Sequence, residues 1–270
     1  MGITIVKPIN TLPLSITGEK CVLKCNHCKG HYLKGMIALS KVERKIQKNN
    51  YKSILISGGF DLNGKLENIS KDILESLKKK GFKLNCHLGL IGEEDIKDIM
   101  GLIDEISFDL ILDEAVIQKV FHLKKTPEDF KDTFKFLKNH FSVNPHIVVG
   151  LNYGKIEKEY EAIDFLSKFQ PLNIIFIIFT PIKNTPMEHV PPPPINMLKK
   201  FFLYTKEKVP KANLYLGCVR PSSDYREKAD FLAYELGFKA IVNPHPKVLE
   251  YLKKSDLIEN YFYECCAFLK

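Results

Sequence analysis

Short apolar runs alternate with amphipathic helical segments along almost the whole chain of 270 residues, and this alternation restricts the folds open to it. The predicted strands are 12–17, 53–57, 83–88, 105–110, 145–151, 173–180, 213–218 and 240–243. The predicted helices are 40–48, 70–80, 93–103, 127–140, 155–169, 195–208, 225–236 and 245–254. Such alternation is typical of parallel strands joined by helices.

Eight strand–helix units are the number that closes a barrel, so we predict an α/β fold of the (β/α)8 TIM type. A doubly wound open sheet is the alternative, because periodicity alone does not show closure. We expect one barrel domain over residues 1–255, since such barrels run to about 200–250 residues. Residues 256–270 are expected to form a tail that packs on the barrel and carries Cys265 and Cys266.

The composition is that of a globular protein, with 45% hydrophobic and 27% charged residues. The net charge of +8 comes from scattered lysines, as in 78–80, which favours a solvated surface over a nucleic-acid-binding face. No apolar run approaches the roughly 20 residues of a membrane helix, and the first residues lack a signal-peptide core. We therefore expect a cytoplasmic protein with no nucleic-acid and no membrane partner.

Three cysteines stand close together after the first predicted strand, at Cys21, Cys25 and Cys28. Their C-x3-C-x2-C spacing allows three thiolates to hold three irons of a [4Fe–4S] cluster and to leave the fourth iron open. Structural zinc is the alternative, because His27 or His31 would complete a Cys3His set. The odd and clustered cysteines, seven in all, fit a reduced compartment better than a disulfide framework.

This motif, placed after the first strand of a βα protein, resembles that of the radical S-adenosylmethionine (radical SAM) superfamily, and the resemblance covers nearly the whole chain. It implies that the open iron binds SAM and that an electron from the cluster cleaves SAM to a 5′-deoxyadenosyl radical. It also implies a reductant such as ferredoxin or flavodoxin. His27 stands where the family usually has an aromatic residue, and its flat ring would stack on adenine.

Glycines at two further strand ends are similar to family motifs. Gly58 and Gly59 correspond to a Gly-Gly-Glu motif whose backbone receives the methionyl amino group, with Phe60 in place of glutamate. Gly150 corresponds to one glycine of a pattern that lines the adenine. The resemblance therefore assigns these three glycines to the SAM site, although a lone Gly-Gly at a strand end is an ordinary turn more often than not.

Polar side chains also stand at the ends of the third and fourth predicted strands, at His87 and Asp109, and His146 lies near the start of the fifth, where the family pattern has a glycine. If they face the mouth of the barrel, we expect them to bind the SAM carboxylate, its ribose or the substrate. A core histidine and a helix N-cap are the structural alternatives. Because side chains alternate along a strand, the choice depends on which face each residue occupies.

The loop 180–187 is similar to a Pro-x-x-Gly-Thr-Pro loop of the biotin synthase branch, with Asn184 in place of glycine. The resemblance is closest to the biotin and lipoyl synthases, particularly short biotin-synthase-like proteins that act as two-component lipoyl synthases. It implies sulfur insertion at an unactivated carbon. It also implies a small-molecule or lipoyl-carrier-protein substrate and a paralogous radical SAM partner.

Four more residues are expected to complete this site. Arg220 would act in catalysis, by anchoring a substrate carboxylate or by lying beside a second cluster. Cys218, Cys265 and Cys266 would hold an auxiliary Fe–S cluster, and buried structural cysteines are the alternative. Two other functions stay open: a radical SAM rearrangement, cyclisation or methyl transfer in cofactor biosynthesis, and a noncatalytic scaffold stabilised by zinc or an Fe–S cluster.

Overall fold

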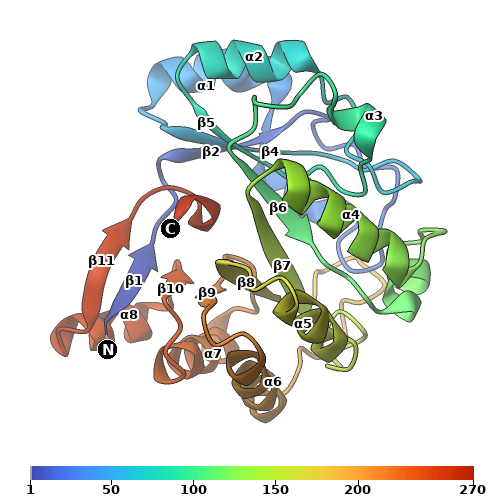
Figure 1. Ribbon diagram of the computed structural model, residues 1–270. Coiled ribbons are helices and arrows are strands. Elements are labelled where there is room, and N and C mark those ends of the chain that lie inside the picture. The colour runs from blue at the N-terminus through green and yellow to red at the C-terminus, as the bar shows by residue number, and fades with distance from the viewer. Residues whose placement is uncertain (1) are drawn as a thin grey trace.

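The computed structural model describes residues 2–270, in which one parallel sheet curls into a partial barrel (Figure 1). The order of its strands is β11-β1-β10-β9-β8-β7-β6-β5-β4-β2-β3. The bounds are β1 Ile3–Val6, β2 Thr11–Ser15, β3 Ile37–Ala38, β4 Ser53–Ser57, β5 Lys83–Cys86, β6 Glu105–Asp109, β7 Val143–Val149, β8 Asn173–Ile178, β9 Asn213–Leu216, β10 Ala240–Val242 and β11 Ile258–Phe262. All pairs of these strands are parallel, so their carboxyl ends meet at one end, which we call the mouth.

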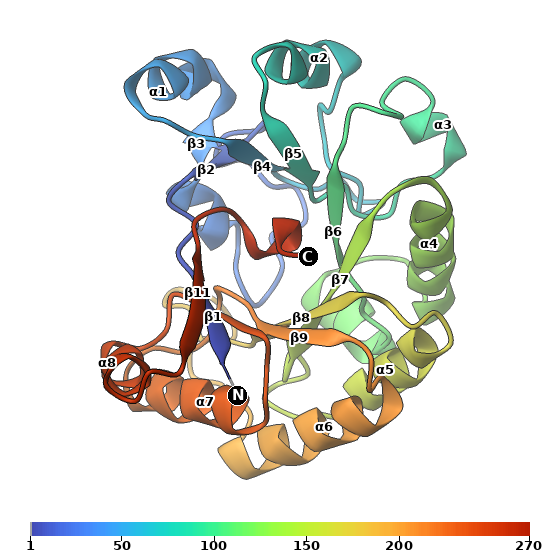
Figure 2. The ribbon, with the colours of Figure 1, turned by 60° about the vertical axis from the view of Figure 1, so that its left-hand side comes forward.

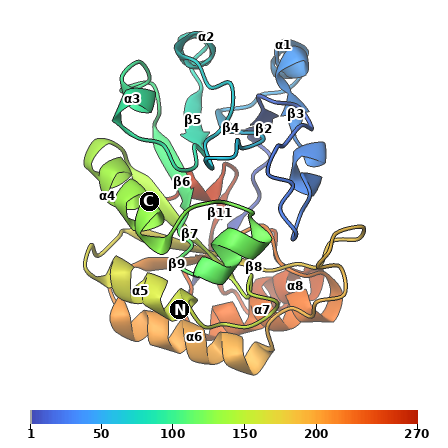
Figure 3. The ribbon, with the colours of Figure 1, turned by 90° about the vertical axis from the view of Figure 1, so that its right-hand side faces the viewer.

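Helices cover the outer side of the sheet (Figure 3). They are α1 Val42–Lys48, α2 Lys71–Lys79, α3 Glu93–Ile96, α4 Pro127–His140, α5 Glu159–Ser167, α6 Ile195–Lys208, α7 Ser223–Glu235 and α8 Pro246–Lys254. Short 3-10 turns occupy η1 His31–Gly35, η2 Leu39–Lys41 and η4 Cys266–Phe268, and a π turn occupies η3 Val116–Val120. Within residues 2–270, no helix has the length and apolar character to span a bilayer.

Helix α4 shows how local sequence produces these elements. Thr126 caps it by accepting a hydrogen bond from the backbone of Asp129, whose carboxylate bonds back to Thr126. Pro127 fills the first turn, where no backbone donor is needed. The stripe formed by Phe130, Phe134 and Leu137 is buried, which fastens the helix to the sheet.

The predicted α/β barrel architecture is confirmed, and the eight predicted strands are present as β2 and β4 to β10. The sheet differs from a simple eight-stranded ring because its two edges, β11 and β3, are not paired with each other. Strand β1 pairs with β10 and β11, whereas β2 pairs with β4 on the opposite side. Backbone bonds from Lys7 N to Phe262 O (2.7 Å) and from Asn10 N to Tyr263 O (2.8 Å) join the segment between β1 and β2 to the end of β11.

The segment predicted as a tail contributes both to the sheet and to the barrel interior. Its first part forms edge strand β11. The part that follows, 264–270, turns into the ring of strands, and Figure 2 shows η4 at the centre of that ring. It lies at the amino ends of the strands, where its partners include Thr11, Asn144 and Asn173. The mouth, at the opposite end, carries the cysteine loop.

Candidate functional site

The three cysteines of the C-x3-C-x2-C motif lie in a loop that follows β2 at the mouth. Tight turns fold this loop, with Cys28 N bonded to Cys25 O (3.1 Å) and His31 N bonded to Cys28 O (2.7 Å). Lys24 and Lys29 adopt left-handed backbone conformations, with φ of 45° and 44°. Cys25 is buried, and Cys21 and Cys28 are half-buried. The fold therefore gathers the three predicted cluster ligands in one compact loop.

Asn26, inside the motif, fixes this loop to the segment that ends η3. Its backbone N donates to Val120 O (2.8 Å), and its side chain donates to Lys119 O (2.8 Å). The amide oxygen of Asn26 also contacts Nε2 of His122 (3.0 Å). We did not predict this support from the sequence, because the two segments are more than 90 residues apart and only the polar Asn between two cysteines hints at it.

The thiols of the loop influence one another electrostatically. Hydrogen bonding from Cys25 lowers the pKa of Cys28 to about 4, although burial opposes this shift. The same bond to Cys28 raises the pKa of Cys25, and burial raises it further. Thiolates are the ligands of iron–sulfur clusters, so the donor set fits a [4Fe–4S] cluster. His27 Nδ1 is buried without a hydrogen-bond partner beside these thiols.

Cluster and zinc sites place their ligands differently. Zinc gathers all of its ligands on one ion, whereas the three thiolates of the predicted cluster bind three separate irons. In the described part of the chain, no group of three or more His, Cys, Asp or Glu side chains is arranged around a single metal position.

Gly58 and Gly59, which follow β4, lie directly against the cysteine loop. A Cβ atom on Gly59 would stand 2.1 Å from Lys20 O and 2.7 Å from Cys21 Cα, so only glycine fits there. The backbone N of Gly59 donates to Thr17 Oγ1 (2.7 Å), which holds the two segments together. The structure thus places the predicted Gly-Gly backbone next to the first cluster cysteine.

His87, Asp109 and His146 come together on the inner face of the sheet. His87 follows β5, Asp109 ends β6 and His146 lies in the middle of β7, where it is the register partner of Asp109. The rings of His87 and His146 lie 5.3 Å apart. These three residues therefore lie together on adjacent strands, and the cysteine loop follows β2 of the same sheet.

Burial keeps the two histidines of this group uncharged. It lowers the pKa of His87 to about 4, and it lowers that of His146 to about 4 with a further contribution from His87. Burial raises the pKa of Asp109, whereas His146 opposes that shift. His146 Nδ1 lies 3.0 Å from Asn144 O, and a carbonyl only accepts. The Nε2 atom of neutral His146 is therefore an acceptor.

The contacts of Gly150 within the protein account for a glycine at this position, whether or not a cofactor binds there. Its φ is 82°, and a Cβ atom would stand 2.7 Å from the ring of Pro193. Its backbone N donates to Glu159 Oε1 (2.7 Å) at the start of α5. The position ends β7 in a turn that packs on the proline segment, and its assignment to the adenine site rests on the family resemblance alone.

Arg220 requires a correction, because its contacts do not support the catalytic role predicted from the sequence. Its side chain is 0% exposed and forms a bidentate pair with Asp230 of α7, at 2.6 Å (Nε to Oδ1) and 3.1 Å (NH2 to Oδ2). The guanidinium also donates to the carbonyls of Gly217, Val242 and Asn243. A side chain engaged in this way joins α7 to the ends of β9 and β10 instead of anchoring a substrate.

Cys218, Cys265 and Cys266 lie close enough to influence one another. Cys218 follows β9 and is the exposed member of this group. Cys266 is buried and packs with Tyr215 and other apolar residues of the interior. Its hydrogen bond lowers the pKa of Cys265. Asn85 Nδ2 lies 3.6 Å from the Cys265 sulfur.

No protein-family model and no curated protein matches the chain. Among solved structures, the FeFe-hydrogenase maturase HydG from Carboxydothermus hydrogenoformans superposes with a TM-score of 0.66 and 14% identity, over 97% of this chain and 68% of HydG. Methylornithine synthase PylB gives a TM-score of 0.64 and 11% identity, over 95% of this chain and 83% of PylB.

A third similar structure is Streptococcus suis SuiB bound to S-adenosylmethionine, with a TM-score of 0.56 and 15% identity. The match covers 80% of this chain and 51% of SuiB, so the chain spans about half the length of that protein. At such low identities these likenesses show the fold. The chain therefore shares the partial-barrel fold of these three proteins.

Proposed function

We propose that the protein is a radical SAM enzyme in which Cys21, Cys25 and Cys28 hold a [4Fe–4S] cluster that binds SAM. The observation that carries this proposal is the compact loop of three thiols at the mouth, packed directly on Gly59. The fold shared with PylB, HydG and SAM-bound SuiB supports it. When bound, the cluster supplies the electron that cleaves SAM to a 5′-deoxyadenosyl radical.

The side chains around the loop suggest how the chain binds the cofactor. Asn26 holds the loop on the segment after η3, and Gly59 allows the backbones of two segments to meet. His87 and His146 present neutral imidazoles to the interior space, and Asp109 adds a carboxyl group between their strands. We assign these three side chains to hydrogen bonds with SAM or with the substrate.

Anaerobic cluster reconstitution tests the proposal. We expect the wild-type protein to take up iron and sulfide and, with a reductant and SAM, to form 5′-deoxyadenosine. Substitution of any of Cys21, Cys25 or Cys28 by Ala removes this activity, because an incompletely held cluster does not assemble. Cys86→Ala is the matched control, since that thiol is buried in the apolar core. A colourless zinc protein would contradict the proposal.

A second, narrower proposal is sulfur insertion at an unactivated carbon, as in biotin and lipoyl synthases. The adjacent thiols of Cys265 and Cys266 in the barrel interior favour it, with Cys218 as the further predicted ligand. These thiols would hold an auxiliary Fe–S cluster that supplies sulfur when bound. A small molecule or a lipoyl-carrier protein would be the substrate, and a paralogous protein a partner. Ferredoxin or flavodoxin would supply electrons in the cytoplasm, which keeps exposed thiols reduced.

Iron analysis separates sulfur insertion from a rearrangement, cyclisation or methyl transfer. A content of about eight irons per chain supports an auxiliary cluster, and a content of about four excludes it. The Cys265→Ala, Cys266→Ala double variant keeps the SAM cluster in either case. Under sulfur insertion this variant loses about half of its iron and all sulfur transfer. Unchanged iron and product turnover in the double variant exclude a sulfur donor at that position.

A further inference from the structure

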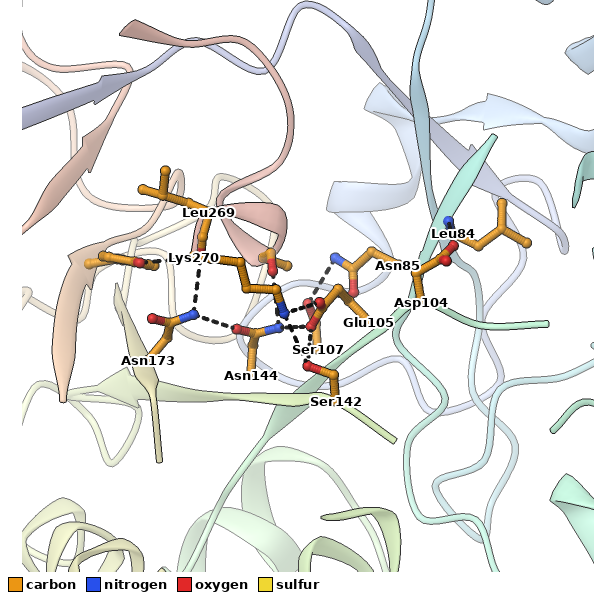
Figure 4. A network of polar contacts seen from close by, with 12 residues as sticks. Leu84, Asn85, Asp104, Glu105, Ser107, Ser142, Asn144, Asn173, Leu269 and Lys270 are labelled. Atoms are coloured by element: carbon orange, nitrogen blue, oxygen red, sulfur yellow. Dashed lines mark hydrogen bonds and ion pairs between the residues drawn. The ribbon is translucent and has the colours of Figure 1, made fainter. Parts of the chain in front are cut away.

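The amino ends of the strands place polar side chains on the inner face of the sheet, in an arrangement that needs a partner. Asn85, Glu105, Asn144 and Asn173 are all buried. Buried amide and carboxylate groups are costly unless they form hydrogen bonds. These side chains bond to one another and to Ser107 and Ser142, and segment 264–270 supplies further bonds, as Figure 4 shows. Its contacts are Asn144 Nδ2 to Ala267 O (3.2 Å), Asn173 Nδ2 to Leu269 O (3.1 Å), Tyr215 OH to Leu269 O (3.2 Å) and Lys270 Nζ to Glu105.

Lys83, at the start of β5, also contacts segment 264–270. Its Nζ atom lies 2.7 Å from Glu264 Oε1 and 4.9 Å from the centre of the Phe268 ring. The Lys83 side chain is 46% exposed, whereas that of Glu264 is only 11% exposed. One accessible lysine therefore contacts the segment at two positions, through an ion pair and a cation–π contact.

Cys265 lies between these two sets of contacts and is directed toward the interior. Its backbone N donates to Thr11 Oγ1 (2.7 Å), and its sulfur lies 3.6 Å from Asn85 Nδ2. Asn85 and His87 are alternate residues of one extended segment, so they share its inner face. The thiol of Cys265 is thus on the same face of the sheet as the His87 and His146 rings.

We propose that segment 264–270 is an end wall of the reaction space, latched by Lys83, which closes the amino end of the barrel interior and leaves the mouth as the route for substrate. Exclusion of water from the interior would protect a reactive intermediate. The statement about substrate entry rests on the proposed function. The wall and its latch rest only on the contacts of Lys83, Asn144 and Asn173.

Hydrogen exchange measured by mass spectrometry on the cluster-loaded protein tests the latch. Lys83→Met removes the ion pair and the cation–π contact, and its long apolar side chain keeps the packing. We expect the amides of residues 265, 268 and 269 to exchange about tenfold faster, since each lost contact is modest. Peptides from β6 to β8 should keep their wild-type exchange.

Lys78→Met is the matched control, because Lys78 forms a single ion pair with Asp104 (2.9 Å) and does not contact the segment. Its exchange at 265–269 should equal that of the wild type. Equal exchange in Lys83→Met and Lys78→Met would overturn the latch, as would an increase spread over the whole sheet, which indicates global destabilisation. Absence of 5′-deoxyadenosine from all three proteins would instead refute the proposed function, and the exchange result would still decide the latch.

Discussion

Replacement of Gly59 by Ala gives the sharpest test of how the glycine segment supports the cysteine loop. The added methyl carbon would stand 2.1 Å from Lys20 O and 2.7 Å from Cys21 Cα, and side-chain carbons do not approach other atoms within 3.0 Å. Both neighbours are backbone atoms, so no rotamer change relieves the clash. The loop must retreat from β4, at a cost of about 1–3 kcal/mol, and Cys21 moves with it.

The assay combines urea unfolding with iron content and 5′-deoxyadenosine formation after anaerobic reconstitution. A displacement of about 1 Å at a catalytic group lowers turnover by about 100-fold, so we expect a loss of that order in Gly59→Ala. Gly35→Ala is the control, because a Cβ atom there meets nothing within 4 Å and φ is not positive. If Gly59→Ala keeps the iron content and the turnover of Gly35→Ala, the packing argument is refuted.

Three further predictions concern the support of the site. Arg220→Met leaves Asp230 buried without its partner, so urea unfolding should show a loss of about 3–5 kcal/mol, and unchanged stability would refute the structural role. Asn26→Ala removes the bonds to Lys119 and His122, so iron uptake monitored by visible absorbance should slow. An unchanged rate would show that the cysteine loop keeps its conformation without these bonds. Burial lowers the pKa of His146 from 6.5 to about 4. Because the unfolded chain binds this proton first, His146 makes stability fall as the pH drops from about 6.5 to 4, and His146→Gln should flatten that slope in urea titrations; an equal slope would contradict the shift.

Most of the fold was predictable because its signals are local. Helix α4 matches its predicted bounds, since the Thr126 cap and Pro127 define its start and the Phe130 and Phe134 stripe defines its buried face. Strand β1 was missed because four residues carry little periodicity and its partners β10 and β11 lie more than 230 residues away. Strand β11 was missed because polar Glu259 and Asn260 interrupt its apolar pattern.

The candidate site also combines features that local sequence predicts with features that depend on distant residues. The spacing of the cysteines and the Gly59 motif are local, and the structure places them side by side. Arg220 was misinterpreted because an arginine after a strand has the same sequence context whether it faces a substrate or a helix. Only the fold shows Asp230 as its partner. Likewise, the hydrogen bond from Asn144 to Ala267 could not be predicted from the sequence, because segment 264–270 is more than 100 residues away.

The central claim is that the loop of Cys21, Cys25 and Cys28 holds a cluster that cleaves SAM. The most direct measurement is anaerobic incubation of the reconstituted protein with dithionite and SAM, followed by mass spectrometry of the products. We predict 5′-deoxyadenosine and methionine from the wild-type protein, and neither product from a variant with all three cysteines replaced by Ala. Wild-type protein that carries its iron–sulfur cluster and still forms no 5′-deoxyadenosine would contradict the account.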